Sequence, residues 1–163
     1  MGSSRPQQLD QPVVVQITSD TANVAKVRTA VVKAARRIGF PEPDVAAVAL
    51  AIDEAVANVI KHGYEGCSGK PIEVTIEGVC RDDNHGLQIT ICDCGRQVDP
   101  TTIAGRELED VRPGGLGTHI IKTICDEVEY THRQPAGMQL RVLKMLDKRP
   151  DNVGEETTRA EQE

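Results

Sequence analysis

Hydrophobic residues recur at spacings of three and four between Pro43 and His62, which predicts an amphipathic helix whose apolar stripe packs against a sheet. The stripe contains Val45, Val48, Ala49, Ile52, Ala55, Val56, Val59 and Ile60. Glu54 and Asn58 lie one turn apart on another side of this helix, and Lys61 and His62 extend that side. A carboxylate and an amide therefore project together. A solvated helix face would show the same pattern, so both interpretations stay open.

Shorter apolar runs, β-branched or alternating with a period of two, predict strands. They are Val13–Thr18, Ile72–Val79, Leu87–Cys92, Glu127–Thr131 and Met138–Met145. Arg81–Gly86 joins the second run to the third, and Gln134–Gly137 joins the last two. Both connections are typical of antiparallel neighbours.

Two further helices complete the predicted elements. One runs over Val24–Ile38 and ends at Gly39, and another begins after Gly114–Gly117 with isoleucines on its apolar side. Gly63 is expected to cap the central helix with a positive φ. The element order predicts an α/β (α+β) two-layer sandwich, in which three helices cover one face of a mixed, largely antiparallel sheet.

The polar segments predict one domain with tails. We expect a disordered leader over residues 1–11, a folded domain over 12–147 and a disordered tail over 148–163. Residues 96–113 are polar and irregular, which is typical of a lid or another functional loop.

Composition narrows the range of partners. The net charge is −6, which argues against a nucleic-acid or membrane surface and favours a protein partner or a Mg-bound nucleotide. The five cysteines are an odd number, and apart from Cys92 and Cys94 no two lie close together. Reduced thiols in the cytoplasm explain them, although a metal or redox pair at Cys92 and Cys94 stays open. No export signal or membrane span is indicated.

Asp93 ends a strand whose Leu87, Ile89 and Ile91 share one face, so the alternation turns its carboxylate toward the core. A buried carboxylate needs a hydrogen-bond donor. Gly95 would let a ligand approach the backbone closely. The alternative is that Asp93 simply caps the following turn.

A glycine-rich stretch, Gly114-Gly115-Leu116-Gly117-Thr118, begins the last helix. Glycines at a helix start expose N–H groups to which the helix dipole attracts phosphate, although a plain helix entry has the same composition. The stretch does not fit the G-x-x-x-x-G-K-[ST] loop. Arg112 beside it could add a positive charge for a γ-phosphate.

Together these stretches resemble a known family. Glu54-Ala-Val-Ala-Asn58-Val-Ile-Lys-His62-Gly-Tyr64, Asp93-Cys-Gly95 and Gly115-Leu-Gly117-Thr-His-Ile-Ile-Lys resemble the N, G1 and G2 boxes of the Bergerat-type ATP-binding fold. The leading Glu54, the His-Gly-Tyr after the N box and Asp126–Tyr130 after the G2 helix are similar to anti-sigma factor serine kinases of bacterial partner-switching modules. The resemblance covers Val13–Met145.

The resemblance implies a role for each motif. Asn58 would hold Mg²⁺, Asp93 would accept a hydrogen bond from the adenine amino group, and Glu54 would be the base for the attacking serine hydroxyl. The expected catalytic residues are Glu54 and Arg112, and the expected ATP-binding residues are Asn58, Lys61, His62, Asp93, Gly95, Gly115, Leu116, Gly117 and Thr118. His62 and His119 are expected to hydrogen-bond locally rather than act as catalysts.

The function implied is an ATP-dependent serine protein kinase that sequesters a sigma factor, phosphorylates an anti-sigma antagonist and forms a homodimer. A rival is a non-catalytic binding module that only switches partners. An isolated histidine-kinase catalytic domain fits less well, because Glu54 stands where those domains usually carry Asn. The second glycine of many G1 boxes is replaced here by Gln97, which bears on lid flexibility.

Overall fold

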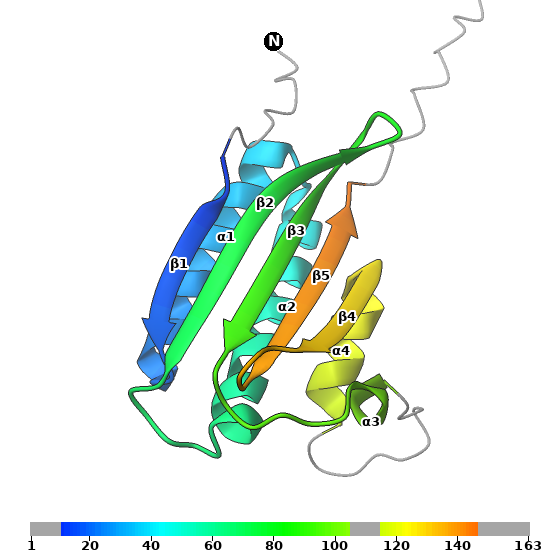
Figure 1. Ribbon diagram of the computed structural model, residues 1–163. Helices are drawn as coiled ribbons and strands as arrows, with labels where there is room; N and C mark the ends of the chain where they lie inside the picture. The colour runs from blue at the N-terminus through cyan, green and yellow to red at the C-terminus, as the bar shows by residue number, and fades with distance from the viewer. Residues whose placement is uncertain (1–10, 105–114, 147–163) are drawn as a thin grey trace, which may run out of the picture.

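The computed structural model describes residues 11–104 and 115–146, which form a helical layer packed on a five-stranded sheet (Figure 1). The strands lie in the order β1-β2-β3-β5-β4. Their bounds are β1 Val13–Thr18, β2 Pro71–Arg81, β3 Asn84–Asp93, β4 Glu127–His132 and β5 Met138–Met145. The described helices are η1 Thr21–Asn23, α1 Val24–Ile38, α2 Glu42–Asn58, η2 Val59–Gly63, α3 Pro100–Ala104 and α4 Leu116–Ile124.

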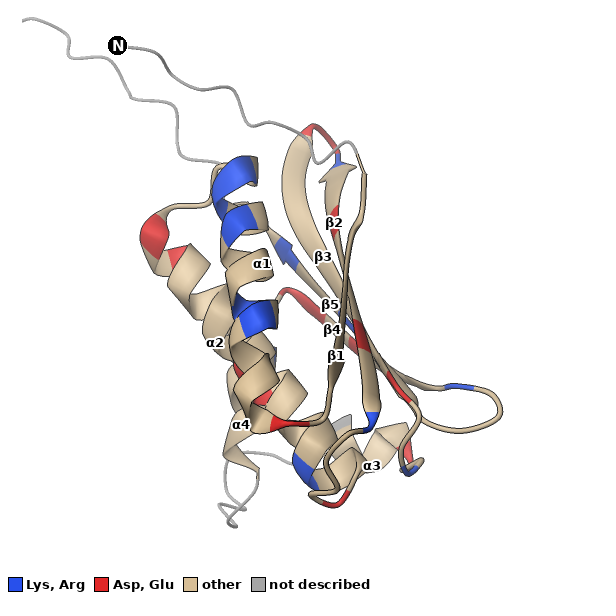
Figure 2. Cartoon of the chain, turned by 90° about the vertical axis from the view of Figure 1, so that its left-hand side faces the viewer, with Lys and Arg blue, Asp and Glu red and all other residues tan. Residues whose placement is uncertain are grey.

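Helices α1, α2 and α4 cover one face of the sheet, and the short α3 lies at the end of the sandwich beside α4 (Figures 1 and 2). This arrangement confirms the expected class. One detail of the expectation was wrong, because every strand pair in the described residues is antiparallel rather than mixed. The helix α4 connects two parallel strands, β3 and β4, but β5 lies between them and pairs with both.

The core lies between the helices and the inner face of the sheet. The apolar stripe of α2 is buried, as its spacing predicts, and Val45, Ile52 and Val56 are at most 2% exposed. They pack with inward-facing side chains of β2 and β3, such as Val74 and Ile89. Burying such side chains contributes roughly 1.5–3 kcal/mol each, so this layer holds α2 firmly against the sheet.

The end of α2 differs from the expectation. The helix does not continue to His62 as a regular α-helix, because Val59–Gly63 forms a π-helical turn in which Tyr64 N–H donates to the Val59 carbonyl at 2.9 Å. Gly63 does not take the expected positive φ; Glu65 and Gly66 do, at 52° and 79°. A π-turn widens the backbone by one residue, and such turns often lie at functional sites.

The connection between β2 and β3 is shorter than expected. Arg81 pairs with Asn84, so only Asp82 and Asp83 form the turn, with φ of 50° and 61°. Two positive φ values define a type I′ hairpin, which usually carries Asn-Gly or Asp-Gly. The Asp-Asp pair lacks that signal, and the sequence therefore suggested a longer loop.

No helix within the described ranges is both long and apolar enough to cross a membrane.

Candidate nucleotide-binding site

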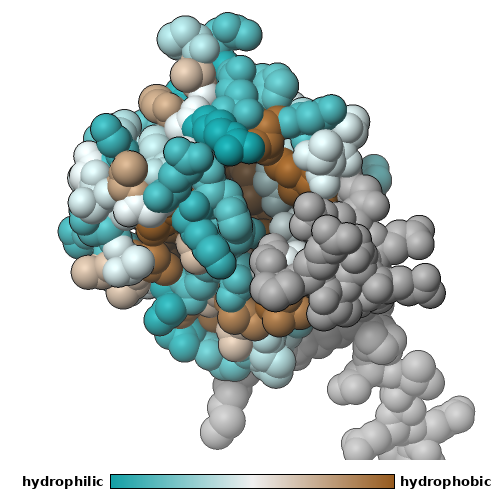
Figure 3. All heavy atoms as spheres, turned by 90° about the horizontal axis from the view of Figure 1, so that it is seen from below, coloured by the Kyte–Doolittle hydropathy of each residue, from teal (hydrophilic) through white to brown (hydrophobic). Residues whose placement is uncertain are grey.

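A cavity of about 510 Å³ lies at one end of the sandwich, between α2, the ends of β3 and β5, and the helices α3 and α4. Seen from that end, hydrophobic surface shows in recesses among hydrophilic side chains (Figure 3). Six residues expected from the sequence to contact ATP line the cavity: Asn58, Lys61, His62, Asp93, Gly115 and Thr118. Residues more than 50 positions apart in the chain thus meet at one place.

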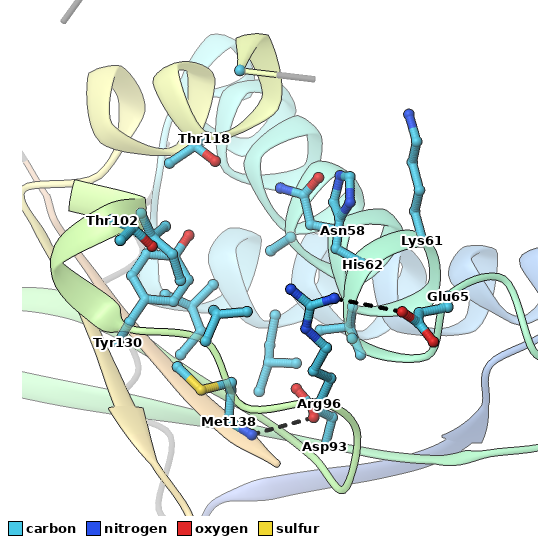
Figure 4. A pocket seen from close by; sticks show the side chains of 18 of the residues that line it. Asn58, Lys61, His62, Glu65, Asp93, Arg96, Thr102, Thr118, Tyr130 and Met138 are labelled. Carbon is cyan, nitrogen blue, oxygen red and sulfur yellow. Dashed lines mark hydrogen bonds and ion pairs between the residues drawn. The ribbon is translucent and has the colours of Figure 1, made fainter. Parts of the chain in front are cut away.

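Asp93 lies at the floor of this cavity and is 3% exposed. Its Oδ1 accepts a hydrogen bond from the Gly95 N–H at 2.8 Å. It accepts another from the Met138 N–H at 3.2 Å (Figure 4). Oδ2 accepts none from the described residues. Burial raises the pKa of this carboxyl above its ordinary value, and the two N–H donors oppose that rise. Asp93 is therefore a buried acceptor with one oxygen left for another donor.

The backbone around Asp93 is held by two side chains, those of Arg133 and Tyr64. Arg133 donates from Nη1 to the Asp93 carbonyl at 2.7 Å. The Tyr64 hydroxyl accepts from the Cys94 N–H at 2.7 Å and donates to the Pro71 carbonyl at 2.5 Å. The end of β3 is therefore fixed in place without any ligand.

Gly95 has a different task from the one expected. A Cβ built on Gly95 would lie 2.4 Å from the Gly63 carbonyl oxygen, so the close approach is made by the backbone of η2 and not by a ligand. The Arg96 N–H also donates to the Gly63 carbonyl at 2.8 Å. Gly95 therefore allows the segment after β3 to pack against the π-turn that follows α2, and it does not line the cavity.

Glu54 and Asn58 lie against the start of α4. A Cβ on Gly117 would be 2.7 Å from Glu54 Oε2 and 3.4 Å from Asn58 Nδ2, so only glycine leaves both side chains in place. The neighbouring Asp53 turns the other way, and its Oδ2 accepts from Arg28 on α1 at 2.6 Å. Of the two adjacent carboxylates, only Glu54 faces α4. Glu54 does not itself line the cavity, but it lies one turn from Asn58, which does.

The N-terminus of α4 forms one wall of the cavity through Gly115 and Thr118. Its N–H groups and dipole favour an anion there. Leu116 was expected to contact the nucleotide, but it does not line the cavity, and it is 68% exposed. In the first turn of α4, Gly117 faces α2 and the adjacent Leu116 faces solvent.

Part of the expected lid lies outside the described residues, and so does Arg112. Within the described part, Asp99 accepts from the Thr101 N–H at 2.9 Å and starts the short helix α3. Gln97, in place of a second glycine, donates to the carbonyls of Arg133 at 2.5 Å and Gly137 at 3.3 Å. The first residues of this segment are thus fastened to the β4–β5 turn.

His119 makes the expected local contact, whereas the cysteines Cys92 and Cys94 contact residues far away in the chain. Thr123 Oγ1 lies 3.4 Å from His119 Nε2, one turn along α4, while both His119 and His62 line the cavity. Cys92 is half-buried and contacts Gln139, whereas Cys94 is exposed beside Arg133. No group of three or more His, Cys, Asp or Glu in the described ranges could hold a metal ion, and every described cysteine is free.

Sequence reasoning missed several residues that line the cavity: Glu65, Arg96, Lys122, Tyr130 and Met138. Lys122 follows Thr118 by one helical turn, and Arg96 directly follows Gly95, so their positions beside the motifs were a usable signal. Tyr130 and Met138 come from β4 and β5, and nothing in their local sequence marks the cavity wall. Burial raises the pKa of Tyr130 to about 12, so its phenol stays neutral.

These donors and acceptors suit a nucleoside triphosphate. The buried Asp93 fits an exocyclic amino group, and Lys61, His62, Lys122 and the α4 N-terminus suit phosphate oxygens. Mg²⁺ prefers oxygen ligands and usually keeps water and phosphate oxygens around it. The amide oxygen of Asn58, beside the start of α4, fits one position of such a shell.

Fold and cavity together define an α+β domain in which one helix, one strand end and one helix start meet around a single cavity. Residues 17–144 match the family model of the histidine kinase-like ATPase domain, and the chain belongs to that family. The resemblance noted from the sequence is confirmed at this level.

Two curated relatives are close in length to this chain. The chain is 26% identical over 155 residues to the serine-protein kinase RsbW of Bacillus pumilus, covering 90% of this chain and 91% of the relative. It is 27% identical over 147 residues to the serine-protein kinase RsbW of Bacillus cereus, covering 85% and 87%.

Solved structures share the fold. The SiaB-SiaC complex from Pseudomonas aeruginosa contains a chain that matches with a TM-score of 0.58 at 14% identity, covering 81% of this chain and 88% of that one. The RsbU and RsbW domains of Rv1364c from Mycobacterium tuberculosis match with a TM-score of 0.55 at 18% identity. There the match covers 82% of this chain but only 31% of the larger one.

Proposed function

We propose that this chain is an ATP-dependent serine protein kinase and anti-sigma factor, which sequesters a sigma factor and phosphorylates an anti-sigma antagonist protein. The observation that carries the proposal is one cavity with a buried acceptor, Asp93, at its floor and the Glu54–Asn58–Gly117 contact at its edge. The similarity to serine-protein kinases named RsbW supports the choice of serine as the acceptor.

Each side chain has a task in this proposal. Asp93 Oδ2 accepts a hydrogen bond from the adenine amino group, while Asn58 holds Mg²⁺ beside the phosphates. The start of α4, with Lys61 and His62, neutralises phosphate charge. Glu54 takes the proton from the attacking serine hydroxyl. Phosphoryl transfer depends mainly on positioning and charge neutralisation, so this small set of groups is sufficient.

Arg112 completes the proposal as a cation for the γ-phosphate. Arg112 belongs to residues 105–114, outside the described part of the chain. Its position just before the glycine-rich stretch Gly114–Gly117 supports this role. An arginine suits this task because its planar guanidinium binds phosphate oxygens in pairs.

We also propose that the protein acts in the cytoplasm as a homodimer. Strand β1 lies at the margin of the sheet, and its Val13 and Val14 are 39% and 54% exposed. An edge strand with exposed apolar side chains is a ready surface for a second copy. Light scattering at micromolar concentration should give the dimer mass, and a monomer mass would refute this part.

Phosphate transfer from radiolabelled ATP to candidate antagonist proteins from the same genome tests the kinase proposal. The expected result is label on a serine of one antagonist with the wild-type chain and much less label, at the same subsaturating ATP concentration, with an Asp93→Asn variant that is still folded. If wild-type protein labels no antagonist yet exchanges partners, the non-catalytic binding module replaces the kinase.

A further inference from the structure

An ion pair crosses the mouth of the cavity. Arg96 Nη1 lies 3.5 Å from Glu65 Oε1, and both residues line the cavity. The two side chains are 66% and 70% exposed, so the pair is accessible to solvent. Exposed ion pairs contribute only about 0.2–1 kcal/mol, so a competing anion can readily take the guanidinium from Glu65.

The backbones on both sides of this pair are fixed. The Arg96 N–H is bonded to the Gly63 carbonyl at 2.8 Å, and Gly95 is packed against Gly63. Glu65 has a φ of 52°, a conformation that non-glycine residues seldom adopt, in the turn after η2. Only the two side chains are therefore free to change partners.

The Arg96 side chain points along the cavity. In Figure 4 it rises from the side of Asp93 toward Asn58 and His62, which is the direction from the adenine position to the phosphates in the proposed function. A guanidinium can bind two phosphate oxygens through parallel N–H groups, as it can bind a carboxylate. The phosphates of a nucleotide carry more negative charge than the one carboxylate of Glu65, so they compete well for Arg96.

We infer that Arg96 is a nucleotide-binding residue whose guanidinium leaves Glu65 and contacts a phosphate of the bound nucleotide. The inference rests on the proposed function, since it assumes that the cavity takes ATP. Glu65 acts as a competing anion: it holds Arg96 while the site is empty and repels the phosphates. Removing the charge of Arg96 should therefore weaken nucleotide binding, whereas removing the charge of Glu65 should strengthen it.

Calorimetric titration of ATP into four proteins tests this opposition. Arg96→Ala should weaken ATP binding about tenfold or more, as expected for a charge-assisted hydrogen bond. Glu65→Gln should tighten it roughly twofold to fivefold, the worth of an exposed ion pair. In the Arg96→Ala background, Glu65→Gln should have a smaller effect, because no guanidinium remains to be released.

A matched pair elsewhere provides the control. Arg36 and Glu42 form an ion pair of similar exposure, 57% and 67%, between α1 and α2, and neither lines the cavity. Arg36→Ala and Glu42→Gln should leave ATP affinity unchanged. Thermal melting of each variant checks that the fold is intact.

The choice of ligand locates the contact. Arg96→Ala should weaken ADP binding as it weakens ATP binding, while adenosine, followed by ligand-detected NMR, should bind equally to both proteins. An equal loss with adenosine would place Arg96 on the base or ribose and overturn the phosphate contact.

Failure of the inference differs from failure of the proposed function. Wild-type protein that binds no ATP would remove the nucleotide site altogether. Wild-type protein that binds ATP, with Arg96→Ala unchanged or Glu65→Gln weakened, would refute the inference and leave the kinase proposal standing.

Discussion

At one end of the cavity Asp93 and its neighbours are held by several hydrogen bonds, whereas at the other end Glu54 and Asn58 make no side-chain hydrogen bond to any described residue. Around Asp93 the donors are the N–H groups of Gly95 and Met138 and the Arg133 side chain. Glu54 and Asn58 instead pack closely against Gly117, where any side chain would push them aside.

The difference suggests a division of labour. A preformed acceptor at Asp93 can recognise a base without rearrangement, because its geometry is already set by the backbone. Glu54 and Asn58 keep their oxygens free for groups that arrive with the reaction, namely the metal-bound phosphates and the acceptor hydroxyl in the proposed function. Substitutions at the first end should therefore affect folding and affinity. Those at the second end should affect transfer, and at Asn58, the proposed Mg²⁺ ligand, they should affect affinity as well.

The largest effect on stability is expected at Gly137, which has a φ of 91° and packs on the Asp93 backbone. A Cβ there would lie 2.0 Å from the Asp93 carbonyl oxygen. Gly137→Ala should lower the free energy of unfolding in urea by about 2–4 kcal/mol, from backbone strain and overlap together. Gly66 is the matched control, because its φ is 79° but nothing lies within 4 Å of a Cβ. Gly66→Ala should cost only about 1 kcal/mol.

Equal losses for the two glycine variants would show that strain alone matters. The tight packing of the β4–β5 turn on Asp93 would then contribute little to the rigidity of this end of the cavity.

Asp93→Asn should separate affinity from folding. The amide oxygen of the asparagine can still accept hydrogen bonds from the Gly95 and Met138 N–H groups. An NH₂ group takes the place of Oδ2, however, so a donor and no longer an acceptor faces the adenine amino group. ATP affinity measured by calorimetry should fall by roughly 1–3 kcal/mol. Unchanged affinity in a folded variant would rule out the adenine site at Asp93.

The same variant has a pH signature. Because the pKa of Asp93 in the folded protein is raised above the ordinary value of 3.8, ionising this carboxyl costs folding free energy. This cost is absent at a pH below the ordinary pKa of the unfolded chain. It grows as the pH rises from that value through the higher pKa of the folded protein. The melting temperature of Asp93→Asn relative to wild type should therefore increase from about pH 3 to pH 7. A difference that falls with pH would contradict the raised pKa.

The smallest effect is expected at Gln97, which fastens the start of the expected lid to the β4–β5 turn. Gln97→Ala removes these hydrogen bonds from an exposed side chain, so the free energy of unfolding should fall by about 1 kcal/mol or less. Hydrogen exchange should speed up at residues 96–98 and at the turn, and stay unchanged in β2. Exchange at residues 96–98 and at the turn that stays at the wild-type rate would mean that Gln97 does not hold this segment in place.

The sequence predicted the elements that carry a strong period, and missed features that depend on distant neighbours. Strands β1 and β5 and helix α1 have the expected bounds, because β-branched runs and a 3.6-residue pattern are local signals. The inward Asp93 followed from alternation along β3. The position of β5 between β3 and β4 could not be read in this way, since it depends on pairing across the whole sheet.

The candidate site shows the same limit. The resemblance to the N, G1 and G2 boxes implied that Asn58, Asp93 and Thr118 surround one nucleotide, and all three line the cavity. The close contact of Gly95 with Gly63 was not foreseen, because Gly63 lies in the π-turn after α2, which no residue pattern signals. Leu116 was grouped with its glycine neighbours although its side chain faces solvent.

The central claim is that Glu54 acts on the acceptor hydroxyl and does not hold the nucleotide. The most direct test measures the rate of phosphate transfer to a cognate antagonist and the affinity for Mg-ATP in wild type and Glu54→Gln. We expect transfer to fall about a hundredfold or more while affinity stays within about twofold. Asn58→Ala, the matched change one turn along α2, should lose both transfer and affinity. Transfer by Glu54→Gln at the wild-type rate, or an equal loss of affinity and transfer, would contradict the account.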